Sequence, residues 1–200
     1  MFERQLRAIL RTGLECPVTV LFPMVTTIDE LRSARAMLAK AAAGVGCPPG
    51  QLPPGFEVGA MIEVPAFALR ARAVAPLVDV MSIGSNDLTQ YTLAAERGNP
   101  DVAFLADPVD PAVLALIAAI CRGATRNTRV AVCGELASDP QAAVLLIGLG
   151  VHELSMTPRA IPEVKDRIRR TSAKDAKHFA NLALQRDSAA SVRALLSDLN

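Results

Sequence analysis

Five short apolar segments alternate with segments of helical period, and this alternation constrains the fold more than any other feature of the chain. The apolar segments span residues 17–24, 57–63, 78–83, 129–133 and 152–156. The helical segments that follow them are 27–43, 65–75, 88–96 with 112–125, 141–149 and 161–170. Each crossover helix returns the chain to the same end of the sheet, so consecutive strands pair in parallel. The sequence therefore predicts an α/β fold.

Five strands are too few to close a barrel that needs eight. The pattern predicts either an open sheet or the back portion of a (β/α)8 TIM-type barrel, with about five strand-helix units. Further helices are expected at 3–11, 173–185 and 190–199, and Thr27 with Glu30 predicts a capping box. In a partial barrel the strand at 17–24 is an exposed edge, which invites pairing with a missing half or with another copy.

Composition excludes several classes of protein. Of the 200 residues, 51% are apolar and 20% charged, and the net charge is +1 with acids and bases interspersed. This balance leaves no excess or cluster of positive charge of the kind that binds nucleic acid or an anionic membrane. No apolar run approaches the roughly 20 residues of a membrane span, and the N-terminus has no signal-peptide pattern. The cysteines at 16, 47, 121 and 133 are far apart, which argues against zinc or a disulfide framework and favours a reducing, cytoplasmic setting.

Polar residues follow the predicted strands where each strand ends. They are Glu63, Asn86 with Asp87, Cys133 with Glu135, and Ser155 with Met156. In sheets of this kind ligands bind outside the carboxyl ends of the strands. We therefore expect these side chains to face one rim.

Glu63 and Asp87 come from adjacent strands and could share Mg²⁺, although acids at helix N-termini are an equally good interpretation of the spacing. Arg97 could hold an anionic ligand with its guanidinium, or form a solvated ion pair with Glu96. Cys133 could act as an acid or nucleophile, or only pack, as we expect of the other three cysteines. The histidines at 152 and 178 have no predicted role.

Four stretches resemble a known family. Residues 22–24, 59–66, 82–99 and 133–137 are similar to the barrel of phosphoenolpyruvate-protein phosphotransferase, enzyme I of the bacterial sugar phosphotransferase system. The resemblance extends over nearly the whole chain. Related dikinases and phosphoenolpyruvate synthases share part of 82–99, but 92–94 and 134–137 look more like enzyme I.

The resemblance implies a role for each matching residue. Glu63 and Asp87 match Mg²⁺ ligands, and Asn86 and Arg97 match residues that hold the phosphate of phosphoenolpyruvate. Cys133 matches the acid that protonates the enolate to give pyruvate. The family passes the phosphoryl group through a histidine to the phosphocarrier protein HPr for sugar uptake, and it forms homodimers.

The resemblance also implies missing parts. The swivelling histidine domain and the first barrel strands, with their arginines, find no match, so residues 1–200 are expected to be the C-terminal portion of the barrel domain. Alone it is expected to be inactive in phosphotransfer, because the rim has three carboxylates against Arg97 while the substrate is anionic. The alternatives are a vestigial, dimerisation or regulatory module, and a fragment of a pyruvate phosphate dikinase or phosphoenolpyruvate synthase.

Overall fold

A single parallel sheet forms the centre of the molecule. The computed structural model describes residues 1–96 and 98–197. Its strands are β1 (Val18–Phe22), β2 (Phe56–Ile62), β3 (Val80–Gly84), β4 (Arg129–Cys133) and β5 (Glu153–Ser155). They pair in sequence order, and every pair is parallel. The α/β class and parallel pairing predicted from the alternation are confirmed, and β1 lies at one edge of the sheet as expected.

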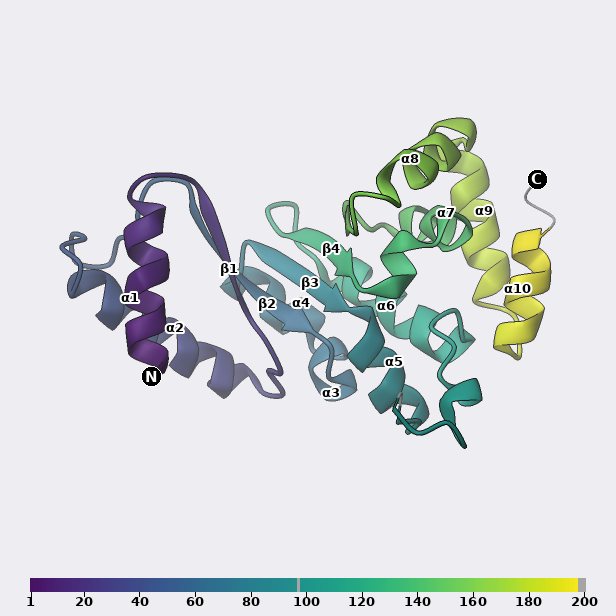
Figure 1. Ribbon diagram of the computed structural model, residues 1–200, viewed down its shortest axis with the longest axis horizontal. Coiled ribbons are helices and arrows are strands. Elements are labelled where there is room, and N and C mark those ends of the chain that lie inside the picture. Colours follow the sequence, from purple (N-terminus) through teal and green to yellow (C-terminus); the bar gives the residue numbers. More distant parts are fainter. Residues whose placement is uncertain (97, 198–200) are drawn as a thin grey trace.

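Helices connect the strands and continue beyond the last of them (Figure 1). They are α1 (Phe2–Gly13), α2 (Ile28–Ala43), α3 (Pro65–Ala68), α4 (Ala71–Val74), α5 (Ser85–Leu93), α6 (Pro111–Gly123), α7 (Pro140–Leu149), α8 (Ile161–Arg170), α9 (Ala173–Ala183) and α10 (Ala189–Ser197). Three short 3₁₀ helices also lie within the described residues: η1 (Ala75–Leu77), η2 (Ala103–Leu105) and η3 (Glu135–Ser138). The predicted end of the last helix, at 198–199, lies outside the described residues.

The predicted capping box at the start of α2 is present. The Thr27 hydroxyl accepts a hydrogen bond from the Glu30 N–H at 3.2 Å, and the Glu30 carboxylate accepts one from the Thr27 N–H at 2.8 Å. Two of the backbone donors that a helix start leaves without intrahelical partners are satisfied in this way.

The prediction of one continuous helix at 65–75 is wrong. Pro65 begins α3 at a first-turn position, as predicted, but the helix ends at Ala68 and restarts as α4. Pro76 then lies in η1, and a proline inside a longer helix would clash with the carbonyl of the preceding turn. The segment is three short helical pieces: Pro76 limits α4, and α3 ends separately at Ala68, with Leu69 exposed after it.

The two faces of the sheet differ in character. Side chains alternate between the faces along each strand. One set packs into the main hydrophobic core: Val20, Phe22, Val58, Ala60, Ile62, Met81, Ile83, Val130 and Val132. We call the opposite side the inner face, and it carries Thr19, Leu21, Glu57, Gly59, Met61, Val80, Ser82, Gly84, Arg129, Ala131, Cys133, Glu153 and Ser155. Polar groups are thus concentrated on the inner face.

At the amino ends of the strands the inner face carries a polar network. Arg129 on β4 donates to both oxygens of Glu57 on β2, at 2.7 and 2.9 Å, and lies 3.6 Å from Glu153 on β5. Thr19 on β1 donates to Glu57 at 2.8 Å. The network links four of the strands at the end opposite the predicted rim.

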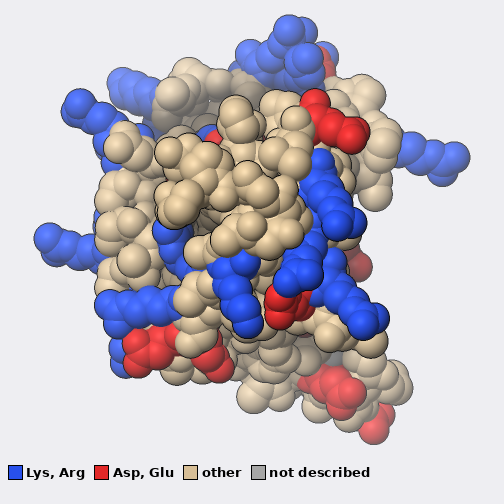
Figure 2. Space-filling view, turned by 90° about the vertical axis from the view of Figure 1, so that its left-hand side faces the viewer, with Lys and Arg blue, Asp and Glu red and all other residues tan. Residues whose placement is uncertain are grey.

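Helices α1 and α2 lie side by side at one end of the molecule, and α8, α9 and α10 gather at the other (Figure 1). Figure 2 shows the α1–α2 end, where Lys and Arg side chains project among acidic ones. Two of the arginines form exposed ion pairs within their helices, Arg7 with Glu3 at 2.7 Å and Arg32 with Asp29 at 2.9 Å. No helix within residues 1–96 and 98–197 has the length and apolar character needed to cross a membrane.

Candidate functional site

Strand register aligns four residues in one row across the carboxyl end of the inner face. Gly84 pairs with Cys133, and Cys133 pairs with Ser155. Glu63 directly follows Ile62, which pairs with Ile83, so Glu63 is level with Gly84. The alternation of side chains places the four residues on the same side of the sheet. The row brings together three of the positions that the sequence predicted at the rim.

An open depression of about 400 Å³ lies over the β4 and β5 end of this row. Its lining includes five residues predicted from the strand ends, which are Asn86, Cys133, Glu135, Ser155 and Met156. It also includes Gly134, which belongs to the 133–137 stretch that carries the family resemblance, and Ser138 and Thr157, which no sequence pattern marked. Glu63 and Asp87 are not part of this lining.

A second depression of about 220 Å³ adjoins the first, since Asn86 and Glu135 line both. Thr89 and Gln90 of α5 form one side of it, and Ala103, Ala106 and Pro108 of the loop after α5 form the other. Nothing in the sequence pattern pointed to this loop wall, because its contribution depends on how the loop folds back over α5. Asn86 therefore stands between two connected hollows.

The backbone around Gly134 orients the Asn86 side chain. Oδ1 of Asn86 accepts a hydrogen bond from the Glu135 N–H at 3.2 Å. Gly134 has φ +104°, and a Cβ there would lie 2.5 Å from Ser85 Oγ and 2.9 Å from Asn86 Oδ1. Only glycine suits both the conformation and the close approach. Because its oxygen is occupied, Asn86 keeps its amide N–H groups as donors toward a ligand.

Helix α5 begins at Ser85, three residues earlier than the predicted start at Leu88. Asn86 and Asp87 consequently lie in the first turn of a helix rather than in a loop. No side chain caps this N-terminus, and its N-cap residue is Gly84. The N–H groups at a helix start carry partial positive charge and favour an anion. This charge partly offsets the acidic side chains of the rim.

The thiol of Cys133 is half-buried and has two polar neighbours. Ser82, which is 3% exposed, donates to Sγ at 3.8 Å, and the thiol donates to the Ile83 carbonyl at 3.5 Å. Burial raises the pKa of the Cys133 thiol above its ordinary value of 9.0, the Ser82 hydrogen bond lowers it, and the charges of Glu63 and Asp87 raise it further. With its pKa raised, the group carries its proton at neutral pH.

Glu63 is a buried carboxylate, 3% exposed, with no cationic side chain of the described residues within ion-pair distance. Its Oε1 accepts a hydrogen bond from the Met24 N–H at 2.7 Å. Every fully buried polar side-chain atom in the described part of the chain has a hydrogen-bond partner. Oε2 has no such partner there, so it reaches solvent.

Residues 1–96 and 98–197 contain no group of three or more His, Cys, Asp or Glu side chains arranged to hold a metal. Mg²⁺ needs only one or two protein carboxylates and completes its shell with water and ligand oxygens. A buried carboxylate without a cationic neighbour, with one oxygen open to solvent, fits such an ion. Glu63 and Asp87 thus remain suitable donors, while Arg97, the predicted phosphate ligand, lies outside the described residues.

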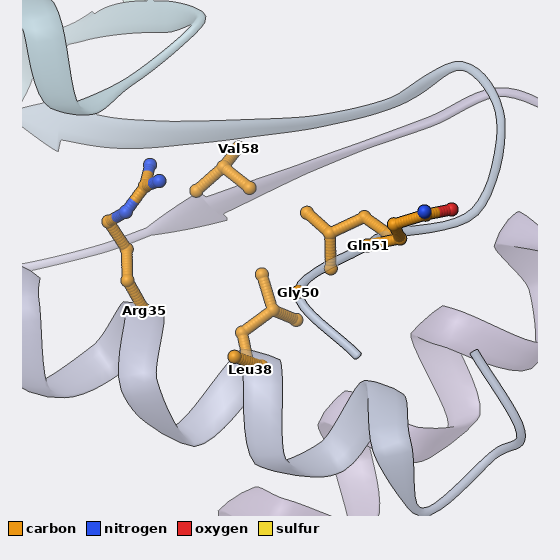
Figure 3. A pocket seen from close by; sticks show the side chains of 7 residues that line it. Arg35, Leu38, Gly50, Gln51 and Val58 are labelled. Carbon is orange, nitrogen blue, oxygen red and sulfur yellow. The ribbon is translucent and has the colours of Figure 1, made fainter. Parts of the chain in front are cut away.

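A cavity of about 120 Å³ lies apart from the rim, between α2, residues 50–52 and β2 (Figure 3). Arg35 rises from α2 toward β2, and its guanidinium donates to the Leu77 carbonyl. Val58, which lines this cavity, belongs to the core-facing side of β2. The cavity is therefore on the opposite side of the sheet from the candidate site.

A parallel sheet with its strands in sequence order and polar residues at their carboxyl ends is the arrangement found in part of an α/β barrel. A citrate lyase from Burkholderia xenovorans LB400 has a similar fold, with a TM-score of 0.62 and 17% identity over 98% of this chain and 67% of that chain. The chain belongs to the family described as PEP-utilising enzyme, PEP-binding domain, which it matches over residues 1–173.

Curated relatives extend the comparison. The multiphosphoryl transfer protein of Xanthomonas campestris pv. campestris is 46% identical over 98% of this chain and 23% of its own length. The phosphoenolpyruvate-protein phosphotransferase of Haemophilus influenzae is 38% identical over 99% of this chain and 35% of its own length, and that of Haloferax volcanii is 41% identical over 98% and 35%. The chain thus spans 23–35% of the length of these relatives. The family expected from residues 22–24, 59–66, 82–99 and 133–137 is confirmed.

Proposed function

We propose that this chain forms the phosphoenolpyruvate-binding part of a phosphoenolpyruvate-protein phosphotransferase, as the C-terminal portion of its barrel domain. The observation that carries the proposal is the convergence of Glu63, Asn86, Asp87 and Cys133 on the carboxyl ends of β2, β3 and β4. The family description supports the choice of substrate, and the names of the relatives support the reaction.

In this proposal Glu63 and Asp87 hold Mg²⁺. When bound, the ion supplies positive charge that neutralises the substrate phosphate and helps to orient it. Carboxylate oxygens suit a hard cation of this kind. The lack of any cationic side chain within ion-pair distance of Glu63 in the described residues supports this role, since a buried carboxylate otherwise needs a partner.

Asn86 and Arg97 bind the phosphate group. The Asn86 amide oxygen accepts from the Glu135 N–H, which leaves the NH₂ group free to donate to phosphate oxygens. The uncapped N-terminus of α5 adds further N–H groups beside it. Arg97 would contribute a guanidinium, whose fork of donors matches phosphate geometry.

Cys133 supplies a proton. Transfer of the phosphoryl group breaks the P–O bond of phosphoenolpyruvate and leaves the electron pair on the enolate oxygen. The enolate carbon then takes the thiol proton of Cys133, giving pyruvate and a thiolate. Ser82, which donates to Sγ, stabilises that thiolate until solvent returns a proton. A thiol with a raised pKa suits this role because it holds its proton at neutral pH.

The phosphoryl acceptor of the whole enzyme is a histidine of another part of the protein, which passes the group to HPr in a cytoplasmic sugar-uptake system. Neither histidine of this chain lines the depressions. His152 accepts a hydrogen bond from the Val130 N–H, and His178 packs edge-on against Phe179. These 200 residues alone are therefore proposed to bind substrate without transferring phosphate.

Calorimetric titration of phosphoenolpyruvate with Mg²⁺ into the 200-residue chain tests the proposal. We expect binding that needs both the metal and Asp87, so that Asp87→Asn weakens it about tenfold or more. Asp79→Asn is the matched control, because Asp79 lies at the opposite end of β3, where its carboxylate accepts from the Val58 N–H. Binding that is insensitive to Asp87, or absent from a chain that circular dichroism shows to be folded, would contradict the proposal and favour a structural or regulatory role.

A further inference from the structure

Gly84 is the one position of the four-residue row that has no side chain, and the space above it is filled by Glu63. A Cβ built on Gly84 would lie 2.4 Å from Glu63 Oε2, 3.0 Å from Glu63 Cβ and 3.1 Å from Met61 Cε. The φ angle of Gly84 is −79°, which any residue can adopt. The need for glycine here is therefore steric, and the group that requires the space is the Glu63 carboxylate.

The other side of the same carboxylate is held by the loop after β1. The Met24 N–H donates to Glu63 Oε1 at 2.7 Å. Met24 has φ +53°, a left-handed conformation that is unfavourable for a residue with a side chain. The Met24 side chain is 51% exposed, so packing of that side chain does not account for the conformation. The hydrogen bond to Glu63 is the interaction that the conformation permits.

We propose that Gly84 and the Met24 N–H act together as a clamp that positions the Glu63 carboxylate for the metal. Gly84 leaves room for the carboxylate to lie across β3, and the Met24 N–H holds Oε1, so that Oε2 is the oxygen open to solvent. Groups that orient a ligand in this way lower the entropy lost when the ion binds, and their removal weakens metal affinity by about 10–100-fold. The inference rests on the proposed role of Glu63 as a ligand.

A double-mutant cycle with Mn²⁺ as the probe tests the part of the clamp that Gly84 provides. Affinity is measured by calorimetry or by electron paramagnetic resonance of free Mn²⁺, with no substrate and no turnover. Gly84→Ala is expected to weaken Mn²⁺ binding about tenfold or more, and Glu63→Ala to weaken it at least as much. Adding Gly84→Ala to Glu63→Ala should cause no further loss of Mn²⁺ affinity, because the carboxylate that the added methyl group would displace is already absent.

Gly59→Ala is the matched control for the added methyl group. It lies on the inner face of β2, where a Cβ would meet Leu21 and Val80 and no carboxylate. We expect a lower melting temperature with Mn²⁺ affinity within twofold of the unmodified chain. A drop in affinity equal to that of Gly84→Ala would show that general disturbance of the sheet explains both, and would overturn the clamp.

Variants of Met24 test the part of the clamp that the Met24 N–H provides. Met24 lies in the loop after β1, so these substitutions fall outside the strands. Met24→Pro removes the N–H, and because its ring fixes φ at about −65° it also abolishes the left-handed conformation at this position. Both changes release the Glu63 carboxylate, so Mn²⁺ affinity should fall about tenfold. Met24→Gly keeps the N–H, tolerates the positive φ and should stay within twofold. Unchanged Mn²⁺ affinity in Met24→Pro would show that the Met24 N–H does not position Glu63.

The outcomes separate the clamp from the proposed function. If Glu63→Ala leaves Mn²⁺ affinity unchanged, the metal site itself is wrong and the clamp with it. If Glu63→Ala weakens binding while Gly84→Ala and Met24→Pro do not, the metal site stands and the clamp is wrong.

Discussion

The Oδ1 atom of Asn86 accepts a hydrogen bond from the backbone N–H of Glu135 at 3.2 Å, which ties the first turn of α5 to the segment after β4. This contact orients the Asn86 amide, because its oxygen is directed at the Glu135 N–H while its NH₂ group stays available as a donor to a ligand. It also depends on Gly134, whose missing side chain allows the two segments to approach.

Asn86→Asp tests the consequence of this contact. The carboxylate can still accept from the Glu135 N–H, so we expect the chain to fold normally. It would present an anionic oxygen where phosphate needs a donor, and phosphoenolpyruvate affinity should fall tenfold or more. Calorimetry measures the loss. Asn127→Asp adds the same charge at an exposed position at the amino end of β4, and should leave the affinity within twofold.

Cys133→Ser should separate proton transfer from binding. The hydroxyl is similar in shape but a far weaker acid, so phosphoenolpyruvate binding should stay within twofold. Turnover can be measured in a chimera in which this chain replaces the aligned part of the Haemophilus influenzae relative, with release of pyruvate as the assay. We expect kcat to fall about 100-fold or more with little change in KM. If instead KM rises, kcat/KM falls by the same factor and kcat is unchanged, Cys133 acts in binding alone.

The raised pKa of Cys133 predicts slow alkylation at neutral pH. Burial is the main cause of the shift, and the Ser82 hydrogen bond opposes it. The thiolate is the reactive form, so iodoacetamide labelling of Cys133 should reach half its maximal rate above pH 9.0, the ordinary thiol value. Ser82→Ala removes the opposing hydrogen bond and should move the midpoint higher still. Residue-resolved mass spectrometry measures both, and a midpoint below pH 9.0 would show that the thiol is less shielded than its surroundings indicate.

The ion pair between Arg193 and Asp107 fastens α10 to the loop that leads into α6. Arg193 donates to both carboxylate oxygens of Asp107, at 2.7 and 2.8 Å. Partial burial opposes ionisation of Asp107, but the hydrogen bonds from Arg193 and the Val109 N–H outweigh it and lower its pKa below the ordinary 3.8. A carboxyl whose pKa is lower in the folded state stabilises the fold above its unfolded pKa, and this stabilisation disappears as the pH falls through the folded value.

Arg193→Gln should therefore lower the free energy of unfolding by about 1 kcal/mol at pH 7, a figure that allows for solvent screening of the half-exposed guanidinium. The loss should shrink as the pH falls below about 3.8, where Asp107 takes up its proton. Urea unfolding at several pH values measures it. Arg186→Gln is the control, since Arg186 is exposed and has no ion pair within the described residues. An Arg193→Gln effect that is independent of pH would point to lost packing instead.

Helices α7 and α9 pack closely at Gly148. A Cβ there would lie 2.1 Å from the Ala176 carbonyl oxygen and 2.8 Å from Ala180 Cβ. Gly148→Ala forces the helices apart, and we expect a loss of about 1–3 kcal/mol in the free energy of unfolding. Gly44→Ala, whose nearest contacts would be at 3.3 Å and include the flexible Arg7 side chain, should change stability by less than about 0.5 kcal/mol. Chemical denaturation compares the two.

Sequence patterns were sufficient for the parallel direction of the strands. Alternation of apolar and helical segments requires parallel crossovers whatever the packing details, and β4 was located at the residues predicted, 129–133. Local signals were also sufficient where a side chain bonds to its own neighbours, as in the capping box of Thr27 and Glu30. The rim residues were found because a change from apolar to polar residues marks the end of a buried strand.

Contacts between distant segments escaped the sequence analysis. The bond from Met24 to Glu63 joins the ends of two strands separated by α2, and no local pattern encodes it. The space above Gly84 is filled by a residue from the neighbouring strand, so a glycine in that strand looks ordinary until the register is known. The second depression depends on a loop that folds back beside α5. Hydrophobic periodicity dictates which elements form and which face is buried, because it reflects one element at a time. Side-chain orientation at the site depends on register and close approach between elements, which are consequences of packing alone.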